Sequence, residues 1–206
     1  MKKKTEAKRQ AILDVAAQVF REFGFKGTLM SEIRARLGGS KSTLYNYFPS
    51  KEELFFEVVS TSTEAEFDMV HDALALSTDN MDESLKHFGE RFLTFLYSPQ
   101  IKAQRHLAIS ESGRTELGRI VYERGVLRTQ ALVTEFLRAA MRLGKLKQAD
   151  PVVATRHLSS LLEAELIDRF LFQQMGEVST EEIKSITARA IDVFMAAYGP
   201  RKNEGQ

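Results

Sequence analysis

Residues 40–48, SKSTLYNYF, carry many side chains that form hydrogen bonds and few that must be buried. Leu44 and Phe48 are four residues apart, so a helix places both on one face. The other positions supply hydroxyl, amide and ammonium groups. Ser and Thr donate or accept, Asn pairs with adenine through two hydrogen bonds, and Lys reaches guanine or phosphate. The pattern predicts a short helix that is anchored by one face and contacts a nucleic-acid duplex with the other.

The candidate DNA contacts lie within this helix and at the starts of two neighbouring ones. Lys51 and Thr28 each begin a predicted helix, where free backbone N–H groups and the helix dipole favour a phosphate. Each tyrosine could instead pack its ring in the core and leave its hydroxyl in solvent, and Lys51 could simply be solvated. The contacts expected within the short helix are Ser40, Lys41, Ser42, Thr43, Tyr45, Asn46 and Tyr47.

No group of residues predicts catalysis. The chain has no cysteine, no G-x-S-x-G and no P-loop, and its four histidines (His71, His87, His106 and His157) fall in separate predicted helices. Glu83, His87 and Glu90 come closest to a metal site by their spacing. The opposite helix face carries Leu85 and Phe88, so these three groups are expected to face water. We therefore expect no enzyme activity, no metal and no cofactor.

Charge is distributed unevenly along the 206 residues, although the net charge is only +1. Residues 1–50 hold 10 Lys or Arg and 4 Asp or Glu, which gives +6, whereas residues 51–206 hold 19 and 24, which gives −5. A basic first quarter on an acidic remainder indicates that the first part meets a polyanion. The lysine-rich start, MKKK, accounts for half of that excess if it is merely solvated. Without a long apolar run, a signal-peptide core or cysteine, we expect a cytoplasmic protein with no membrane partner.

Hydrophobic spacing is helical nearly everywhere, which predicts an all-α fold of about nine helices. Gly24 is the expected stop of the first helix, and Gly125 a possible kink in the seventh. We predict a helix-turn-helix domain over 1–50, a larger effector-binding and dimerisation domain over 51–200, and a flexible tail over 201–206. The expected helices cover about 5–23, 28–37, 40–47, 51 into the seventies, 82–97, 100–110, 115–143, 150–174 and 180–198.

Two short helices joined by a glycine turn and preceded by a longer helix form the helix-turn-helix pattern. The stretch GTLMSEIRARLGGSKSTLYNYFPSKEELFFEVV resembles the head of TetR/AcrR transcriptional regulators, and the likeness covers about residues 8–60. Arg34, Leu37 and Gly39 depart from the usual residues of that pattern. The resemblance implies that Ser42, Thr43, Tyr45 and Asn46 face bases, whereas Thr28, Tyr47 and Lys51 hold phosphates.

The last two predicted helices carry enough apolar residues to pack on more than one side. They could bury their own core on one side and a partner subunit on the other, or form one wide internal core. The resemblance implies a homodimer, held by a four-helix bundle of these helices from both subunits. The expected interface residues are Leu158, Leu161, Leu162, Ile167, Phe170, Ile183, Ile186, Ala190, Val193 and Phe194.

The remainder resembles, more loosely, the C-terminal domain of AefR-like members, over AISESGRTELGRIVYERG, GKLKQADPVVATRHL and IDVFMAAYGP. That resemblance implies a cavity for a small apolar or aromatic effector. Each candidate lining residue could equally be ordinary core or surface. The candidates are Phe67, Phe88, Phe92, Phe95, His106, Glu111, Arg114 and Tyr122.

These observations predict a ligand-responsive repressor that binds a palindromic double-stranded DNA operator as a dimer. Two copies are needed because one helix-turn-helix reads too few base pairs to single out a site. The alternative is a helical interaction module whose basic head binds an acidic protein surface.

Overall fold

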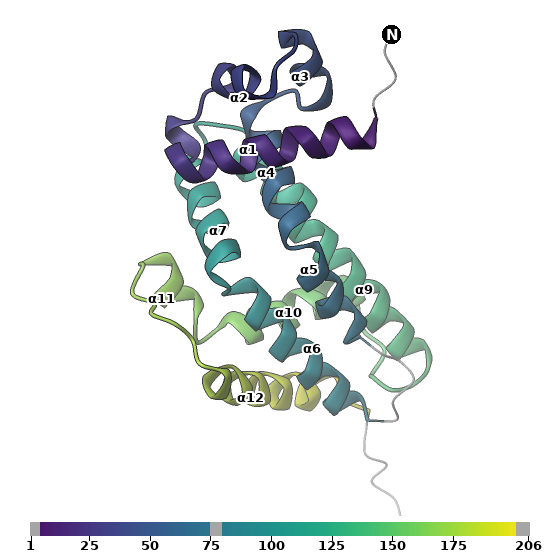
Figure 1. Ribbon diagram of the computed structural model, residues 1–206. Coiled ribbons are helices and arrows are strands. Elements are labelled where there is room, and N and C mark those ends of the chain that lie inside the picture. The colour runs from purple at the N-terminus through teal and green to yellow at the C-terminus, as the bar shows by residue number, and fades with distance from the viewer. Residues whose placement is uncertain (1–4, 75–79, 201–206) are drawn as a thin grey trace, which may run out of the picture. The chain divides into compact units, whose positions relative to one another are not determined.

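The computed structural model describes residues 5–74 and 80–200, and within these ranges the chain is helical with no strand (Figure 1). The prediction of an all-α fold is confirmed. A single isolated bridge joins Ser112 and Thr115 within those ranges. The predicted flexible tail over 201–206 lies outside the described residues. None of the described helices is both long enough and apolar enough to cross a bilayer.

The chain divides into two compact units. We call Met1–Glu64 with Leu107–Glu123 the head unit, and Ala65–His106 with Arg124–Gln206 the body unit. The predicted functional boundary at residues 50 and 51 therefore does not coincide with a boundary between compact units, because the whole of α4 belongs to the head unit.

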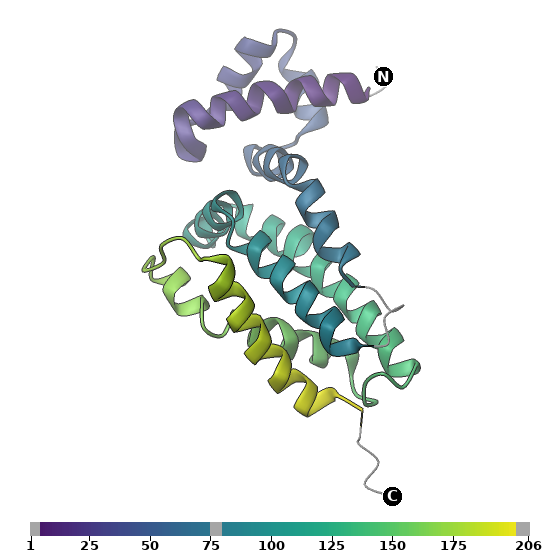
Figure 2. The same cartoon turned by 60° about the horizontal axis from the view of Figure 1, so that its bottom comes forward.

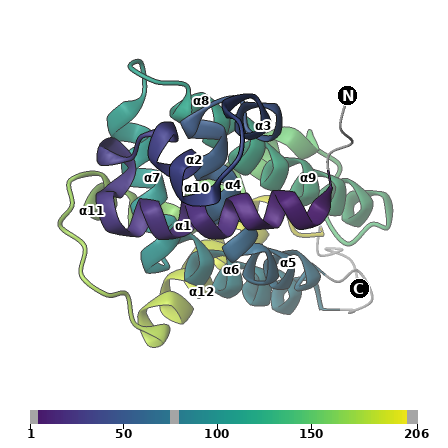
Figure 3. The same ribbon diagram turned by 45° about the horizontal axis from the view of Figure 1, so that its top comes forward.

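The head unit is built on α1, which packs against α2 and α4, while α3 packs against α2 (Figure 3). Its core joins residues from all its long segments, among them Ile12, Ile33 and Leu54, which are fully buried. The expected stop at Gly24 is a kink with φ of 66°, after which helical turns continue to Gly27. The helices are α1 (Glu6–Gly27), α2 (Met30–Leu37), α3 (Lys41–Tyr47), α4 (Lys51–Ser62), the end of α7 (Pro99–Glu111) and α8 (Leu117–Val121).

In the body unit, α6 packs along α12, and α10 packs against both α12 and α9 (Figure 2). Leu85, Leu158 and Phe194 are fully buried in its core. The close approach depends on Gly89, because a Cβ there would lie 2.7 Å from Thr187 Cγ2. The helices are α5 (Glu64–Asp72), α6 (Met81–Leu96), the start of α7, α9 (Leu127–Arg142), α10 (Pro151–Glu163), α11 (Ile167–Leu171) and α12 (Thr180–Tyr198).

Three helices expected to be continuous are interrupted. The helix predicted from residue 51 into the seventies ends at Ser62, where Thr63 Oγ1 donates to the Val59 carbonyl, and α5 follows. The helix predicted over 150–174 separates into α10 and α11. The helix predicted over 115–143 contains a π-helical segment, η1 (Tyr122–Val126), around the suspected kink residue Gly125.

Burial of the His71 imidazole lowers its pKa below the ordinary value. The positive charge of Arg128 also lowers this pKa, whereas the negative charges of Asp68 and Asp72 raise it. Its Nδ1 lies 2.7 Å from the Phe67 carbonyl. Its buried Nε2 has no hydrogen-bond partner within the described ranges. Protonation of Nε2 would therefore place a buried N–H group where no hydrogen-bond acceptor is available.

Acid is expected to destabilise the body unit through His71. As pH falls through about 6.5, the unfolded chain takes up the proton before the folded chain does, so stability is lost below that pH. Thermal melting at pH 7.5 and 5.5 should show a smaller acid-induced drop for His71→Asn than for the wild type. His87→Asn, at an exposed position, is the matched control and should leave the drop unchanged. Equal drops in all three proteins would contradict the assignment.

Candidate nucleic-acid interface

The short helix α3 is held by a turn before it and an apolar anchor beneath it. Gly38 and Gly39 have φ of 70° and 99°, values that glycine adopts without steric cost. Ser40 caps the helix by accepting from the Thr43 N–H. Leu44 is 1% exposed and Phe48 3% exposed. The predicted anchor is thereby confirmed.

The rest of α3 presents polar groups to solvent. Asn46 is exposed, Tyr45 is 38% exposed, and the Lys41 ammonium lies 5.6 Å from the centre of the Tyr45 ring. Thr43 and Tyr47 are half-buried. The geometry is therefore compatible with base contacts, which remain predictions. The exposed members of the predicted set are Ser40, Lys41, Ser42, Tyr45 and Asn46.

Thr28 does not offer the contact predicted for it. Its side chain is 1% exposed, and its hydroxyl donates to the Gly24 carbonyl at 2.7 Å. Its backbone N–H donates to the same carbonyl at 3.2 Å. Both donors thus close the last turn of α1, so Thr28 serves as a structural cap instead of a phosphate ligand.

Lys51 is also engaged inside the head unit. Its half-buried ammonium donates to the carbonyls of Phe25 at 2.9 Å and Thr28 at 3.2 Å. It also lies 4.5 Å from the centre of the Phe25 ring. These contacts tie the end of α1 to the start of α4 and do not favour the phosphate contact expected of the Lys51 side chain, which is tested as follows.

Replacing Lys51 with alanine is expected to destabilise the head unit by about 1–2 kcal/mol, since hydrogen bonds from a charged donor contribute on this scale. DNA binding should weaken through the loss of folded head. The slope of log affinity against log salt concentration should stay unchanged because no phosphate contact is lost. Chemical denaturation and a salt titration measure the two quantities. A slope that falls by about one per protomer would identify Lys51 as a phosphate contact instead.

Other basic side chains of the head unit are paired with carboxylates. Arg36 contacts Glu22 at 2.6 Å and Glu32 at 2.8 Å, and the hydrogen bonds that its guanidinium donates to Glu22 raise the pKa of Arg36 further. Arg9 pairs with Glu57. Glu22 and Glu32 are already counted in the net charge of +6 on residues 1–50, so among these partners only Glu57 lowers the positive charge of the region further.

One contact of Tyr47 could not be read from the sequence. Its hydroxyl oxygen accepts from the backbone N–H of Thr5 at 2.8 Å, across 42 residues of chain. Thr5 is the N-cap of α1, and its own hydroxyl accepts from the Lys8 N–H. The end of α3 and the start of α1 are therefore joined directly.

The predicted effector residues are divided between the two units, and five of them belong to the body unit. Phe88 stacks on Phe92 at 5.6 Å, Phe67 meets Phe95 edge-on at 6.0 Å, and His106 stacks on the core residue Phe170 at 4.1 Å. The other three candidates belong to the head unit. They are the buried Glu111 and the exposed Arg114 and Tyr122.

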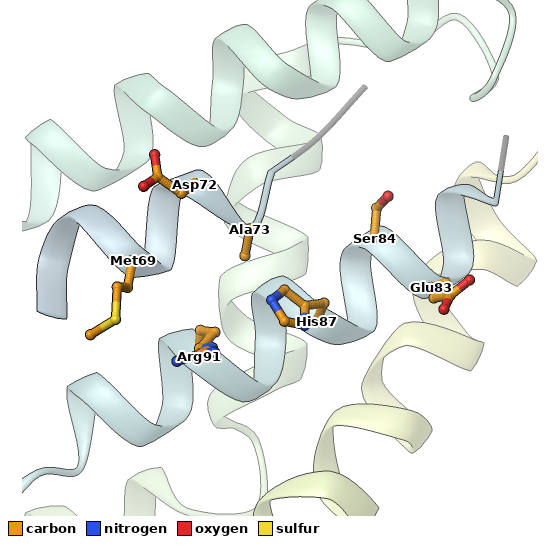
Figure 4. Close-up of a pocket in the computed structure, with 7 residues that line it drawn as sticks. All are labelled: Met69, Asp72, Ala73, Glu83, Ser84, His87 and Arg91. Carbon is orange, nitrogen blue, oxygen red and sulfur yellow. The ribbon is translucent and has the colours of Figure 1, made fainter. Parts of the chain in front are cut away.

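A groove of about 450 Å³ lies between α5 and α6 in the body unit (Figure 4). None of its lining residues was predicted as an effector contact, and most of them are polar or charged. Sequence reasoning missed it because an open groove between two amphipathic helices leaves no periodic signal. The lining residues are Met69, Asp72, Ala73, Glu83, Ser84, His87 and Arg91.

Most residues predicted for the dimer interface are buried inside a single chain. They pack against one another in the body core and are each at most 6% exposed, so the internal core that the sequence left open fits them better than an interface. Leu161 and Ile167 are half-buried, and Val193 is 54% exposed. The corrected residues are Leu158, Leu162, Phe170, Ile183, Ile186, Ala190 and Phe194.

Solved structures resemble the chain over nearly its whole length. A TetR-family regulator from Mesorhizobium loti MAFF303099 is 28% identical, with a TM-score of 0.79, covering 95% of this chain and 100% of that one. The flavonoid-responsive regulator FrrA is 29% identical, with a TM-score of 0.75, covering 96% and 100%.

Curated relatives match shorter segments. The HTH-type transcriptional regulator RutR of Escherichia coli K12 is 47% identical over 53 residues, which are 26% of this chain and 25% of RutR. The transcriptional activator FasR of Mycolicibacterium smegmatis is 34% identical over 91 residues, covering 44% and 41%. The match thus spans a quarter to two fifths of these proteins.

Two family models match the chain. Residues 12–58 match the bacterial regulatory proteins of the tetR family, and residues 83–200 match the C-terminal domain of AefR-like transcriptional repressors. The first match contains α2, α3 and the Leu44 anchor, and the second covers more than half of the chain. This protein therefore belongs to the TetR family of transcriptional regulators, which are DNA-binding proteins and not enzymes.

Proposed function

We propose that this protein is a ligand-responsive repressor that inserts α3 into the major groove of a palindromic operator. The observation that carries the proposal is the division of α3 into two faces. Leu44 and Phe48 fix one face in the core, whereas Lys41, Tyr45 and Asn46 stand free of it. A short helix of this kind fits the width of the major groove. A DNA-binding regulator of this sort acts in the cytoplasm, where a bacterial chromosome lies.

Dimerisation is proposed through α10 and α12. Most of the residues that form the proposed interface differ from those that the sequence predicted. Val152, Val153 and Val193 are 42%, 40% and 54% exposed on these helices. Exposed apolar side chains on neighbouring helices favour contact with a second copy. A two-fold pair presents two copies of α3, which a palindrome with half-sites about 34–36 Å apart accommodates.

The proposed effector is a small aromatic molecule. Supporting this class are the aromatic pairs of the body unit and the similarity to FrrA, a flavonoid-responsive regulator. Release of DNA requires that the effector bind better to a body conformation that misplaces the two heads. The chain passes between the units at Glu64, at His106 and at Glu123, and these segments link a change in the body unit to the head unit.

Selection of bound sequences from random duplex DNA, repeated with flavonoids present, tests the whole proposal. We expect enrichment of one palindrome and weaker retention when an effector is added. Enrichment without symmetry would contradict the dimer. Failure to enrich any sequence would favour the alternative of a protein-interaction module. That alternative needs basic side chains that bind an acidic partner surface, and Arg9 and Arg36 are already paired with carboxylates of the head unit.

Replacing Asn46 with alanine is expected to change the selected sequence at one position of each half-site. Loss of a bidentate contact to a base costs about 1–3 kcal/mol of discrimination. Ser62→Ala, at an exposed position outside α3, is the control and should leave the preference intact. Binding by Asn46→Ala with an unaltered preference would remove this residue from the base-reading set.

A further inference from the structure

We infer that Arg34 on α2 is a further DNA contact, whose guanidinium binds a backbone phosphate beside the site that α3 enters. The inference rests on the proposed function, in which α3 lies in the major groove. Arg34 departs from the usual residue of the TetR/AcrR pattern, and it is exposed on a helix whose one buried residue is Ile33.

The side chain of Arg34 lies on the flank of α2 that points away from α1. Arg36 lies on the flank next to α1, because its guanidinium contacts Glu22 and the Phe23 ring of that helix. Two residues that are two positions apart in an α-helix point about 200° apart around its axis. Arg34 therefore projects from the opposite flank.

The position of Arg34 is close to the turn between α2 and α3. The Gly38 N–H donates to the Arg34 carbonyl at 3.0 Å, so α2 closes one helical turn after Arg34. Ser40 and Lys41 follow the turn and are exposed. The two helices pack against each other, and Figure 1 shows them next to each other. Arg34 thus lies within one helical turn of the loop that carries the first residues of α3.

The Arg34 guanidinium is available for an anion, unlike several other cations of the head unit. Arg9 and Arg36 are paired with carboxylates, and Lys51 donates to two carbonyls. In the part of the chain that the structure describes, no hydrogen bond or ion pair involves the Arg34 guanidinium. Its planar set of N–H donors matches two oxygens of one phosphate.

The docking geometry of a helix-turn-helix places a phosphate at this flank. When the second helix lies in the major groove, the first helix crosses the DNA backbone. Here α2 is that first helix, and its exposed residues Ser31, Arg34 and Ala35 include one charged side chain, Arg34. A phosphate contact positions the protein and supports binding to every sequence alike.

The experiment measures the affinity of the full-length protein for a mixed-sequence duplex and for the selected operator by fluorescence anisotropy, between about 50 and 200 mM salt. Arg34→Gln should weaken binding to both duplexes by the same factor, about tenfold. The slope of log affinity against log salt concentration should fall by about 0.9 per protomer. Arg34→Lys keeps the charge and should keep the slope, while it loses part of the affinity with the planar donor set.

Arg21→Gln is the matched control for charge. Arg21 on α1 is also exposed, has no hydrogen bond or ion pair from its guanidinium in the described part of the chain, and lies outside the helix-turn-helix. Its replacement should leave the slope unchanged. An equal fall of the slope in both glutamine variants would identify a general effect of charge and overturn the contact.

A purely structural role of Arg34 gives a different result. Arg34 lies in the last turn of α2, where a positive charge stabilises the helix. In that case Arg34→Gln melts at a lower temperature and keeps the wild-type slope, which overturns the phosphate contact and leaves the proposed function in place. A changed base preference would also contradict a phosphate contact. A wild-type protein that binds no duplex would overturn the proposed function itself, together with this inference.

Discussion

Replacing Leu44 with alanine is expected to lower the free energy of unfolding by about 3 kcal/mol and to abolish specific DNA binding. Leu44 is 1% exposed and packs in the same cluster as Ile12 and Ile33. Removing a buried leucine side chain costs both its transfer free energy and the cavity left behind, about 2–5 kcal/mol in total. Chemical denaturation gives the first quantity, and anisotropy with the selected operator gives the second.

Tyr45→Ala is the matched comparison for Leu44→Ala. The two residues are adjacent in α3, but Tyr45 is 38% exposed and makes no contribution to the buried cluster. We expect its loss to leave stability within about 0.5 kcal/mol and to weaken DNA binding directly. If Tyr45→Ala unfolds the head unit as much as Leu44→Ala does, the two-faced interpretation of α3 is wrong.

A second large effect is expected at Gly89, where three helices of the body unit meet. An added Cβ would lie 2.7 Å from Thr187 Cγ2 on α12 and 2.8 Å from Leu162 Cδ2 on α10. Thr187 and Leu162 are both fully buried, and the β-branched Thr187 has little rotamer freedom. Gly89→Ala should therefore destabilise the body unit by about 1–3 kcal/mol, as overpacking usually does. Thermal and chemical denaturation measure the loss.

Two further variants separate a steric clash from a general effect of alanine. Thr187→Ser removes the nearer methyl group and should restore part of the stability lost in Gly89→Ala. Gly125→Ala is the glycine control, because a Cβ there meets no atom within 4 Å in the described structure. It should be neutral or slightly stabilising. A Gly125 variant as unstable as the Gly89 variant would disprove the packing argument.

Local signals in the sequence predicted where helices begin and which face is buried better than they predicted which residues far apart in the chain make contact. Ser50 and Ser179 each precede a glutamate three residues later, and both cap a helix as that spacing indicates. The anchor positions of α3 followed from the spacing of Leu44 and Phe48. These features depend on residues that are neighbours in the chain, so their physical cause is visible in the sequence.

Long-range roles could not be predicted in the same way. Lys51 and Thr28 have the residue types of phosphate contacts, and only the fold shows that both are used on carbonyls near the end of α1. Likewise, the apolar face of a helix does not indicate whether that face packs against the same chain or against a second subunit. Leu158 and Phe194 are buried within the body unit, whereas Val193, next to Phe194 in sequence, is exposed.

The π-helical segment η1 has a consequence for comparing related sequences. A π turn holds one more residue than an α turn, and each residue of an α-helix advances the side-chain direction by about 100°. A relative with an uninterrupted helix in this place should be one residue shorter between Tyr122 and Val126. If the two sequences were aligned without that gap, the residue of the relative matched to the buried Leu137 would be one position away from its true counterpart and would point in another direction.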